Sequence, residues 1–163
     1  MTRKRSKYRP MGIALDAWKI GMQGAMRLSV ADQLKASILV RTAVDRCALS
    51  QQTQADWRDI FDALNLVEAM AAVGLVKQAG DFIEAHQANI TQILDRHTST
   101  GSNVLRPAEV DMLRDLSATW AQVLEVCTHR ELFEAYERVK NKVRNVLRAK
   151  SGTPGVRVME ARA

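Results

Sequence analysis

The sequence predicts an all-α protein, a bundle of five to six mostly antiparallel helices with basic flexible termini. Its composition favours helices, because 47% of the residues are hydrophobic while only 5% are aromatic and only three are prolines. Apolar residues recur at helical spacing in several stretches, and short clusters of Gly, Pro, Ser and Thr separate them. At 163 residues, one domain is expected. We divide the chain into a basic N-terminal arm (1–11), a single helical-bundle domain (12–149) and a disordered C-terminal tail (150–163).

The stretch 53–76 is the most apolar predicted helix, and we expect it to lie at the centre of the bundle. Thr53 and Asp56 have the spacing of a capping box at its start. Between residues 69 and 76 there is no charged residue, so this helix needs cover on more than one side. Its apolar stripe comprises Trp57, Phe61, Leu64, Ala71 and Leu75.

Glu68 interrupts this stripe, and a carboxylate there is costly unless it is paired. It is interpreted as a structural ion pair with a basic residue of a facing helix, as a side chain that reaches solvent past a small neighbour, or as a general acid or base paired with His86. Arg41 of the preceding helix is the candidate ion-pair partner, unless it pairs with Asp45 one turn away. Arg41, Glu68 and His86 are therefore a candidate buried polar cluster. His86 and His97 could also bind a metal, but their separation of 11 residues matches no ligand motif. We favour a hydrogen-bonded histidine and expect no metal, no cofactor and no catalytic residue.

Two helices are predicted before the central one. The first covers 13–28, is weakened by Gly21 and Gly24, and depends on packing. The second covers 29–49, with Ser29 as its N-cap and Asp32 three residues later. The inner face of the first is predicted to hold Leu15, Trp18, Met22, Ala25 and Met26, and that of the second Val30, Leu34, Ile38, Val44 and Ala48.

Three helices are predicted after the central one. The first covers 81–97, with Phe82, His86, Ile90 and Ile93 inward, and a loop rich in Ser and Thr follows to Pro107. Pro107 suits the first turn of the next helix, to 126, whose inner stripe comprises Leu113, Leu116, Trp120, Val123, Leu124 and Cys127. Thr128 and Glu131 form a second capping box, which begins the last helix, and Leu132, Tyr136, Val139, Val143 and Leu147 point inward.

The charge is unevenly distributed. Residues 1–10 carry five basic groups and no acidic one, and residues 137–163 carry eight against two, whereas residues 11–136 hold 11 basic and 16 acidic groups. Basic ends of this kind bind phosphates by releasing counterions. A mobile, solubilising terminus and a solvated helix face are the alternatives. The candidate binding residues are Arg3, Lys4, Arg5, Lys7, Arg9, Arg138, Lys142, Arg144 and Arg148.

Cys47 and Cys127 lie in helical patterns without a CxxC pair, and we expect both to be reduced and buried. No apolar run has the length of a membrane span or of a signal peptide. We therefore expect a cytoplasmic protein with no membrane partner.

The opening RKRSKYRP, followed by an all-helical body, resembles small uncharacterised proteins of proteobacterial phages, prophages and plasmids. The resemblance implies a mobile-element accessory protein. We expect a non-catalytic protein that binds nucleic acid or a nucleoprotein complex through its basic arm and last helix. The alternative is a protein–protein effector that inhibits a host defence complex by occupying its nucleic-acid or subunit-interaction surface. The few aromatic residues argue against a platform that stacks single-stranded bases.

Overall fold

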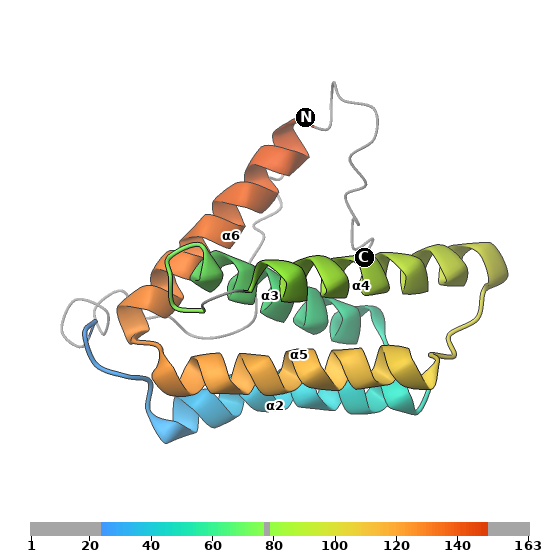
Figure 1. Cartoon of the computed structure of the whole chain (residues 1–163), viewed down its shortest axis with the longest axis horizontal. Helices are drawn as coiled ribbons and strands as arrows, with labels where there is room; N and C mark the ends of the chain where they lie inside the picture. The colour runs from blue at the N-terminus through green and yellow to red at the C-terminus, as the bar shows by residue number, and fades with distance from the viewer. Residues whose placement is uncertain (1–23, 77–78, 150–163) are drawn as a thin grey trace, which may run out of the picture.

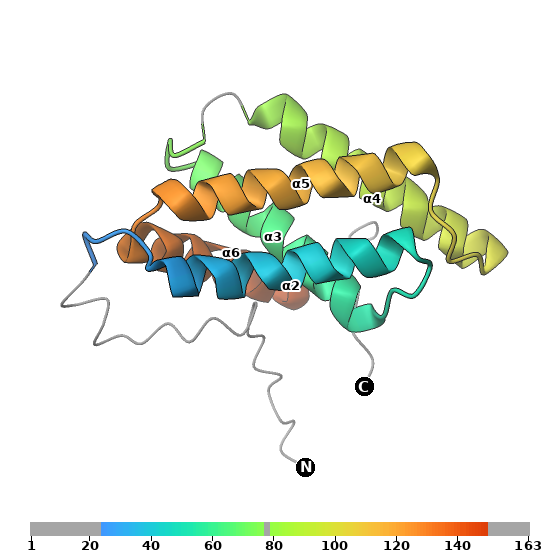
Figure 2. The same cartoon turned by 90° about the horizontal axis from the view of Figure 1, so that it is seen from below.

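The computed structural model describes residues 24–76 and 79–149 and confirms the predicted all-α bundle. Its helices are α2 (Val30–Ala48), α3 (Gln54–Ala71), α4 (Gly80–Thr100), α5 (Pro107–Val126) and α6 (His129–Ala149). Helices α2 and α5 lie side by side and antiparallel as one layer, with α3 and α4 above them in Figure 1 and behind them in Figure 2. From the end of α5, α6 turns away and crosses α3 (Figure 1). The predicted arm and tail lie outside the described residues, as does most of the helix predicted at 13–28.

Helix α3 is the centre of the bundle, as predicted, because it packs against α2, α4, α5 and α6. The capping box at its start is confirmed: the Thr53 hydroxyl accepts from the Asp56 N–H, and the Asp56 carboxylate accepts from the Thr53 N–H at 2.6 Å. The helix is shorter than predicted, ending at Ala71 rather than at residue 76. The chain turns at Gly74, whose φ of 83° is one that glycine adopts without strain.

The inner face of α2 differs from the predicted one. Of the predicted residues only Val44 is buried, whereas Val30, Leu34 and Ile38 are exposed. Small residues make the inward surface, and they let α2 approach its neighbours closely enough for the buried Trp120 indole of α5 to donate to the Ala36 carbonyl at 3.2 Å. The prediction chose the bulkier of two apolar stripes. The buried residues of α2 are Ala36, Val40, Ala43, Val44 and Cys47.

Residues 24–28 are not helical, which corrects the predicted end of the first helix. Their backbone instead bonds to the junction between α5 and α6, where Arg27 and Thr128 form an isolated antiparallel bridge. The Gly24 and Met26 carbonyls accept from the N–H groups of Arg130 and His129, both at 3.0 Å. These two donors lie in the first turn of α6, where an isolated helix leaves N–H groups unpaired. The segment 24–28 therefore caps a helix about a hundred residues further along the chain.

The connection between α4 and α5 begins later than predicted, at Gly101 rather than at His97. The helix continues through Ser and Thr residues that disfavour it, and the hydroxyls of Thr98 and Thr100 donate to carbonyls four residues earlier within it. Gly101, with a φ of 70°, then ends the helix. Pro107 begins α5 as predicted, and the whole predicted inner stripe of α5, from Leu113 to Cys127, is buried.

Candidate functional site

Helix α6 carries the described part of the predicted basic surface. Its capping box is confirmed, since the Glu131 carboxylate accepts from the Thr128 N–H at 2.8 Å and the Thr128 hydroxyl accepts from the Glu131 N–H. Its first half is fixed on the bundle by Leu132, Ala135 and Val139, all buried in the core. Beyond Val139, no described side chain of α6 is fully buried, and the helix extends from the bundle (Figure 1). The described basic residues thus lie on a helix whose first half is packed in the core and whose second half is accessible to solvent.

The basic side chains of α6 do not form one continuous stripe. At 100° per residue, Arg138 and Lys142 lie along one edge of the helix and Lys140 and Arg144 along the other. Arg138 and Arg144 are exposed, and Arg144 contacts the Asn141 side chain at 3.4 Å. Lys140 is half-buried, donates to Glu137 at 2.7 Å and lies 5.9 Å from the centre of the Tyr136 ring. Among the described basic residues predicted to bind, Arg138 and Arg144 are therefore the best placed to meet an external anion.

Lys142 is already engaged with a carboxylate of the bundle. Its ammonium group lies 2.9 and 2.8 Å from the two carboxylate oxygens of Glu68 in α3. The Glu68 side chain is 34% exposed and that of Lys142 is 56% exposed, so water still reaches the pair. Any phosphate that binds Lys142 must compete with Glu68. The other predicted binding residues, Arg3, Lys4, Arg5, Lys7 and Arg9, lie outside the described residues, as does the side chain of Arg148.

The predicted buried cluster of Arg41, Glu68 and His86 is wrong. Glu68 pairs with Lys142 of α6 rather than with Arg41, which is exposed on the outer side of α2. Most of that stripe of α2 faces outward, and Arg41 lies at the surface with it, whereas Val44 alone of the predicted stripe is buried. The interpretation of Glu68 as half of a structural ion pair is confirmed, but with a partner that the sequence did not indicate.

His86 is buried, 3% exposed, and its ring joins α4 to α5. Its Nδ1 lies 2.7 Å from the Phe82 carbonyl and its Nε2 lies 2.9 Å from the Met112 carbonyl, with Asp115 Oδ2 at 3.9 Å. A neutral ring has one N–H and donates to one of these carbonyls, whereas the imidazolium donates to both. This confirms the predicted hydrogen-bonded histidine. Among the described residues no group of three or more His, Cys, Asp and Glu is placed to hold a metal ion, and exposed His97 contacts the Ser102 carbonyl.

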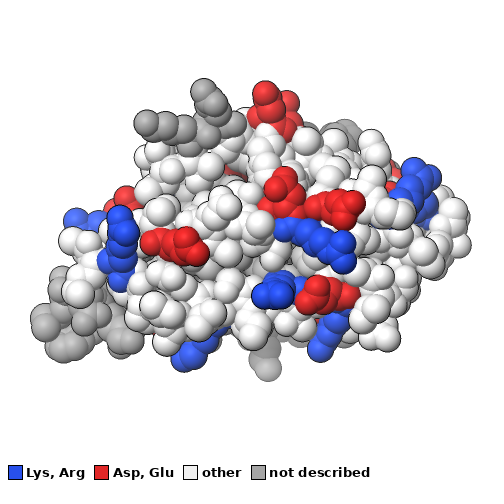
Figure 3. Space-filling model, turned by 60° about the horizontal axis from the view of Figure 1, so that its bottom comes forward, with Lys and Arg blue, Asp and Glu red and all other residues white. Residues whose placement is uncertain are grey.

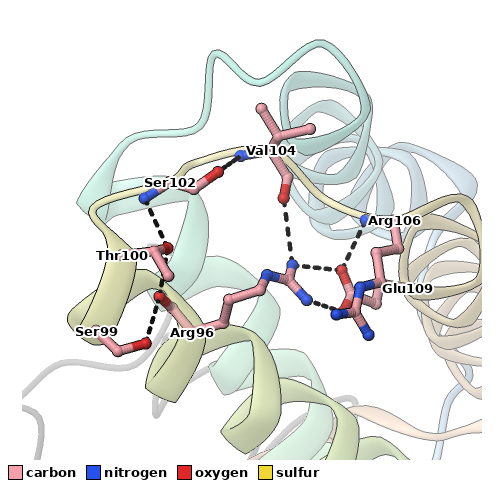
Figure 4. Close-up of polar contacts among 7 residues, drawn as sticks. All are labelled: Arg96, Ser99, Thr100, Ser102, Val104, Arg106 and Glu109. Carbon is pink, nitrogen blue, oxygen red and sulfur yellow. Dashed lines mark hydrogen bonds and ion pairs between the residues drawn. The ribbon is translucent and has the colours of Figure 1, made fainter.

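An ion pair between Arg96 and Glu109 was not predicted. Glu109 is 6% exposed, and its carboxylate accepts from both terminal nitrogens of Arg96 and, at 2.7 Å, from the Arg106 N–H (Figure 4). The Arg96 hydrogen bond lowers the pKa of Glu109, and the Arg106 N–H adds to this effect against the opposing effect of burial. Arg96 also donates to the Val104 carbonyl at 3.2 Å. One guanidinium thus joins α4, the connection and the start of α5. The sequence signal was Glu109 two residues after Pro107, a capping position.

A second carboxylate holds the start of α3. The Asp56 side chain is 6% exposed, and Arg46 of α2 lies 3.1 Å from it. Burial alone would raise the pKa of Asp56, but the hydrogen bonds from the Thr53 hydroxyl and N–H and the charge of Arg46 lower it overall. Cys47 and Cys127 are free and buried, as predicted, and burial raises the pKa of each thiol to about 12. These groups stabilise the bundle rather than offering reactive sites.

Comparisons with protein-family models, with curated proteins and with solved structures find no match for this chain. Within residues 24–76 and 79–149, no helix is long and apolar enough to cross a membrane.

Proposed function

We propose that this chain is a non-catalytic, cytoplasmic accessory protein of a mobile element that binds nucleic acid or a nucleoprotein complex through its basic N-terminal arm and α6. The observation that carries the proposal is the exposure of Arg138 and Arg144 on a helix whose base is fixed in the core. The described residues as a whole hold 14 Lys and Arg against 16 Asp and Glu. The basic excess therefore comes from the ends of the chain, where a phosphate backbone would bind.

Binding of this kind does not depend on the nucleotide sequence of the nucleic acid. Arg138 and Arg144 lie on opposite edges of α6, so a phosphate backbone that meets both must pass across the helix rather than along one ridge. Arginine side chains in this position neutralise phosphates and release counterions, but they do not read base edges. Catalysis is not part of the proposal, because Glu68 is occupied by Lys142 and both nitrogens of His86 face carbonyls.

The test is a salt titration of binding to a fluorescent duplex and to a single strand of equal length. We expect the affinity of the full chain to fall steeply with salt. In the double variant Arg138→Gln with Arg144→Gln, the slope of log affinity against log salt should decrease by about two, roughly one for each lost phosphate contact.

The matched control is the double variant Lys35→Gln with Arg114→Gln. It removes the same charge from exposed positions on α2 and α5. Equal losses in both double variants would mean that only net charge matters, and would reject α6 as the site. A third variant, with the five basic residues of the arm replaced by Gln, measures the share of the arm.

A second candidate function is a protein–protein effector that inhibits a host nucleoprotein complex by occupying its nucleic-acid or subunit-interaction surface. The observation in its favour is the acidic balance of the described residues, which suits a basic groove on a partner. Tagged protein isolated from its host with and without nuclease treatment separates the two functions. A stoichiometric complex that survives nuclease favours the effector, whereas nucleic acid alone, lost on nuclease treatment, favours phosphate binding.

A further inference from the structure

The outer face of α2 exposes a row of large apolar side chains. Val30, Leu34 and Ile38 follow one another at intervals of one turn and are 70%, 61% and 59% exposed. Met26, just before the helix, is 60% exposed. Single exposed apolar residues need no explanation, but a row of them marks a surface that is covered by something else.

This row borders a shallow groove between α2 and α5. The groove has a volume of about 390 Å³, and small side chains line it on the α5 side, namely Ser117, Ala118 and Ala121. Arg41, Asp45 and Arg114 lie along it as well. Helices α3, α4 and α6 lie on the other side of the α2–α5 layer (Figure 2). On the face seen in Figure 3, acidic and basic groups alternate between wide uncharged areas, without a continuous basic patch.

We propose that residues 12–23 of this chain pack as an amphipathic helix against this face of α2 and α5. Leu15, Trp18 and Met22 recur at spacings of three and four residues, which places them on one side of a helix. That side would cover Leu34 and Ile38. Gly12 and Gly21 make such a helix unstable by itself, so it depends on the apolar surface for its formation.

The position of Gly24, where the described structure begins, supports residues 12–23 as the segment that covers this face. Gly24 and Met26 are held by backbone hydrogen bonds at the junction of α5 and α6, and Val30 begins α2 four residues after Met26. Twelve helical residues span about 18 Å, and the distance along α2 from Val30 to Arg41 is about 17 Å at 1.5 Å per residue. A tethered segment also acts at a high effective concentration, which favours it over a separate partner.

This docking is independent of the proposed nucleic-acid binding, since it uses the α2–α5 layer and not α6. For nucleic-acid binding, the docking would change only the place from which the basic arm extends. The basic arm at 1–10 would begin from the outer side of the α2–α5 layer rather than from the junction at Gly24.

The experiment measures the rate at which a maleimide labels an introduced cysteine in the full chain. Cys47 and Cys127 are fully buried, and their pKa values are raised to about 12, so they give little background. In the variant Ile38→Cys we expect labelling to be slower than in the exposed control Gln92→Cys of α4 by roughly tenfold or more, as closed segments protect the sites beneath them. Adding Trp18→Glu should bring the Ile38→Cys rate to that of the control.

Each result decides the proposal. Fast labelling of Ile38→Cys in the otherwise unchanged chain would overturn it. Slow labelling of Ile38→Cys that Trp18→Glu does not accelerate would also overturn it. If the labelling rate then rises on dilution, the face is covered by a second copy of the chain. If Trp18→Glu unfolds the protein, labelling of Cys47 reports this, and the milder Trp18→Ala is used instead, with the same acceleration of Ile38→Cys expected.

Discussion

The two surfaces of the α2–α5 layer differ in how completely their side chains are buried and paired with partners. On the inner surface, Trp120 donates to Ala36, Glu109 is held by Arg96, and His86 faces a carbonyl of α5. On the outer surface, Val30, Leu34 and Ile38 are exposed beside a shallow groove. The difference teaches that the bulk of an apolar side chain does not determine which way it faces. Close packing of α2 against α5 needs the smaller residues inward.

The largest effect is expected from Trp120→Ala on the inner surface. Trp120 is fully buried, and its loss removes both its packing and the hydrogen bond to α2. The free energy of unfolding should fall by about 3–5 kcal/mol, the range for large aromatic residues in cores. Urea denaturation followed by circular dichroism measures it. A loss below 1 kcal/mol would mean that the two helices are not joined there.

Two ion pairs of α5 provide a matched comparison across the layer. Glu109 pairs with Arg96 on the inner side, whereas Asp111, 71% exposed, pairs with Arg114 at 3.3 Å. Glu109→Gln should lower the free energy of unfolding by about 2–4 kcal/mol, because it removes the charge that pairs with Arg96 and replaces one accepting oxygen by an NH2 group that cannot accept. Asp111→Asn should have no measurable effect, because water screens exposed pairs. Equal losses would contradict the contrast between the two surfaces.

The same carboxylates predict a pH dependence. The pKa values of Glu109 and Asp56 are lowered in the folded state from ordinary values of 4.5 and 3.8. Their contribution to stability is therefore complete above these values and is lost as the pH falls through the folded-state pKa. Asp59 acts in the opposite sense, since burial and its neighbours Asp62 and Asp56 raise its pKa. Unfolding measured between pH 7 and pH 3 should show a net loss of stability that becomes smaller in Glu109→Gln.

The smallest effect is expected at the outer surface. Val40→Ala, at a fully buried position of α2, should lower the free energy of unfolding by roughly 1–2 kcal/mol. Leu34→Ala removes a larger side chain from a position that is 61% exposed among the described residues. It should cost less than about 1 kcal/mol even beneath the proposed segment 12–23, because that segment is not stable as a helix by itself. Thermal unfolding of both variants tests this order. A Leu34→Ala loss as large as that of Val40→Ala would mean that the outer face is covered as tightly as the core.

Much of the fold could be predicted from local signals. Helix starts depend on hydrogen bonds or backbone constraints that involve only near neighbours. The predicted starts at Ser29, Thr53, Pro107 and Thr128 are all confirmed. The stripe of α5 was correct because that helix has only one apolar face. Helix α2 has two apolar stripes, and periodicity alone cannot choose between them.

The candidate site was less predictable, because its partners come from distant parts of the chain. Glu68 meets Lys142, which is 74 residues away, and nothing in the spacing of either residue indicates the other. His86 was correctly expected to be hydrogen-bonded, but its acceptor in α5, the Met112 carbonyl, is a backbone group that any residue would supply. Pairs of this kind depend on how the helices cross, which a single sequence does not encode locally.

The contact between residues 24–28 and the start of α6 also bears on the order of folding. It closes a loop of about a hundred residues, whereas the capping boxes and the turn between α4 and α5 involve near neighbours. Closing a long loop carries an entropic cost that local contacts avoid, so such contacts slow folding. The pairing of α2 with α5 closes a long loop as well, since the bond from Trp120 to Ala36 spans 84 residues. We therefore expect the capping boxes and the α4–α5 turn to form before either long-range contact, and α6 to reach its final orientation only when residues 24–28 are in place. On a ribosome, that step must wait until α6 has been synthesised.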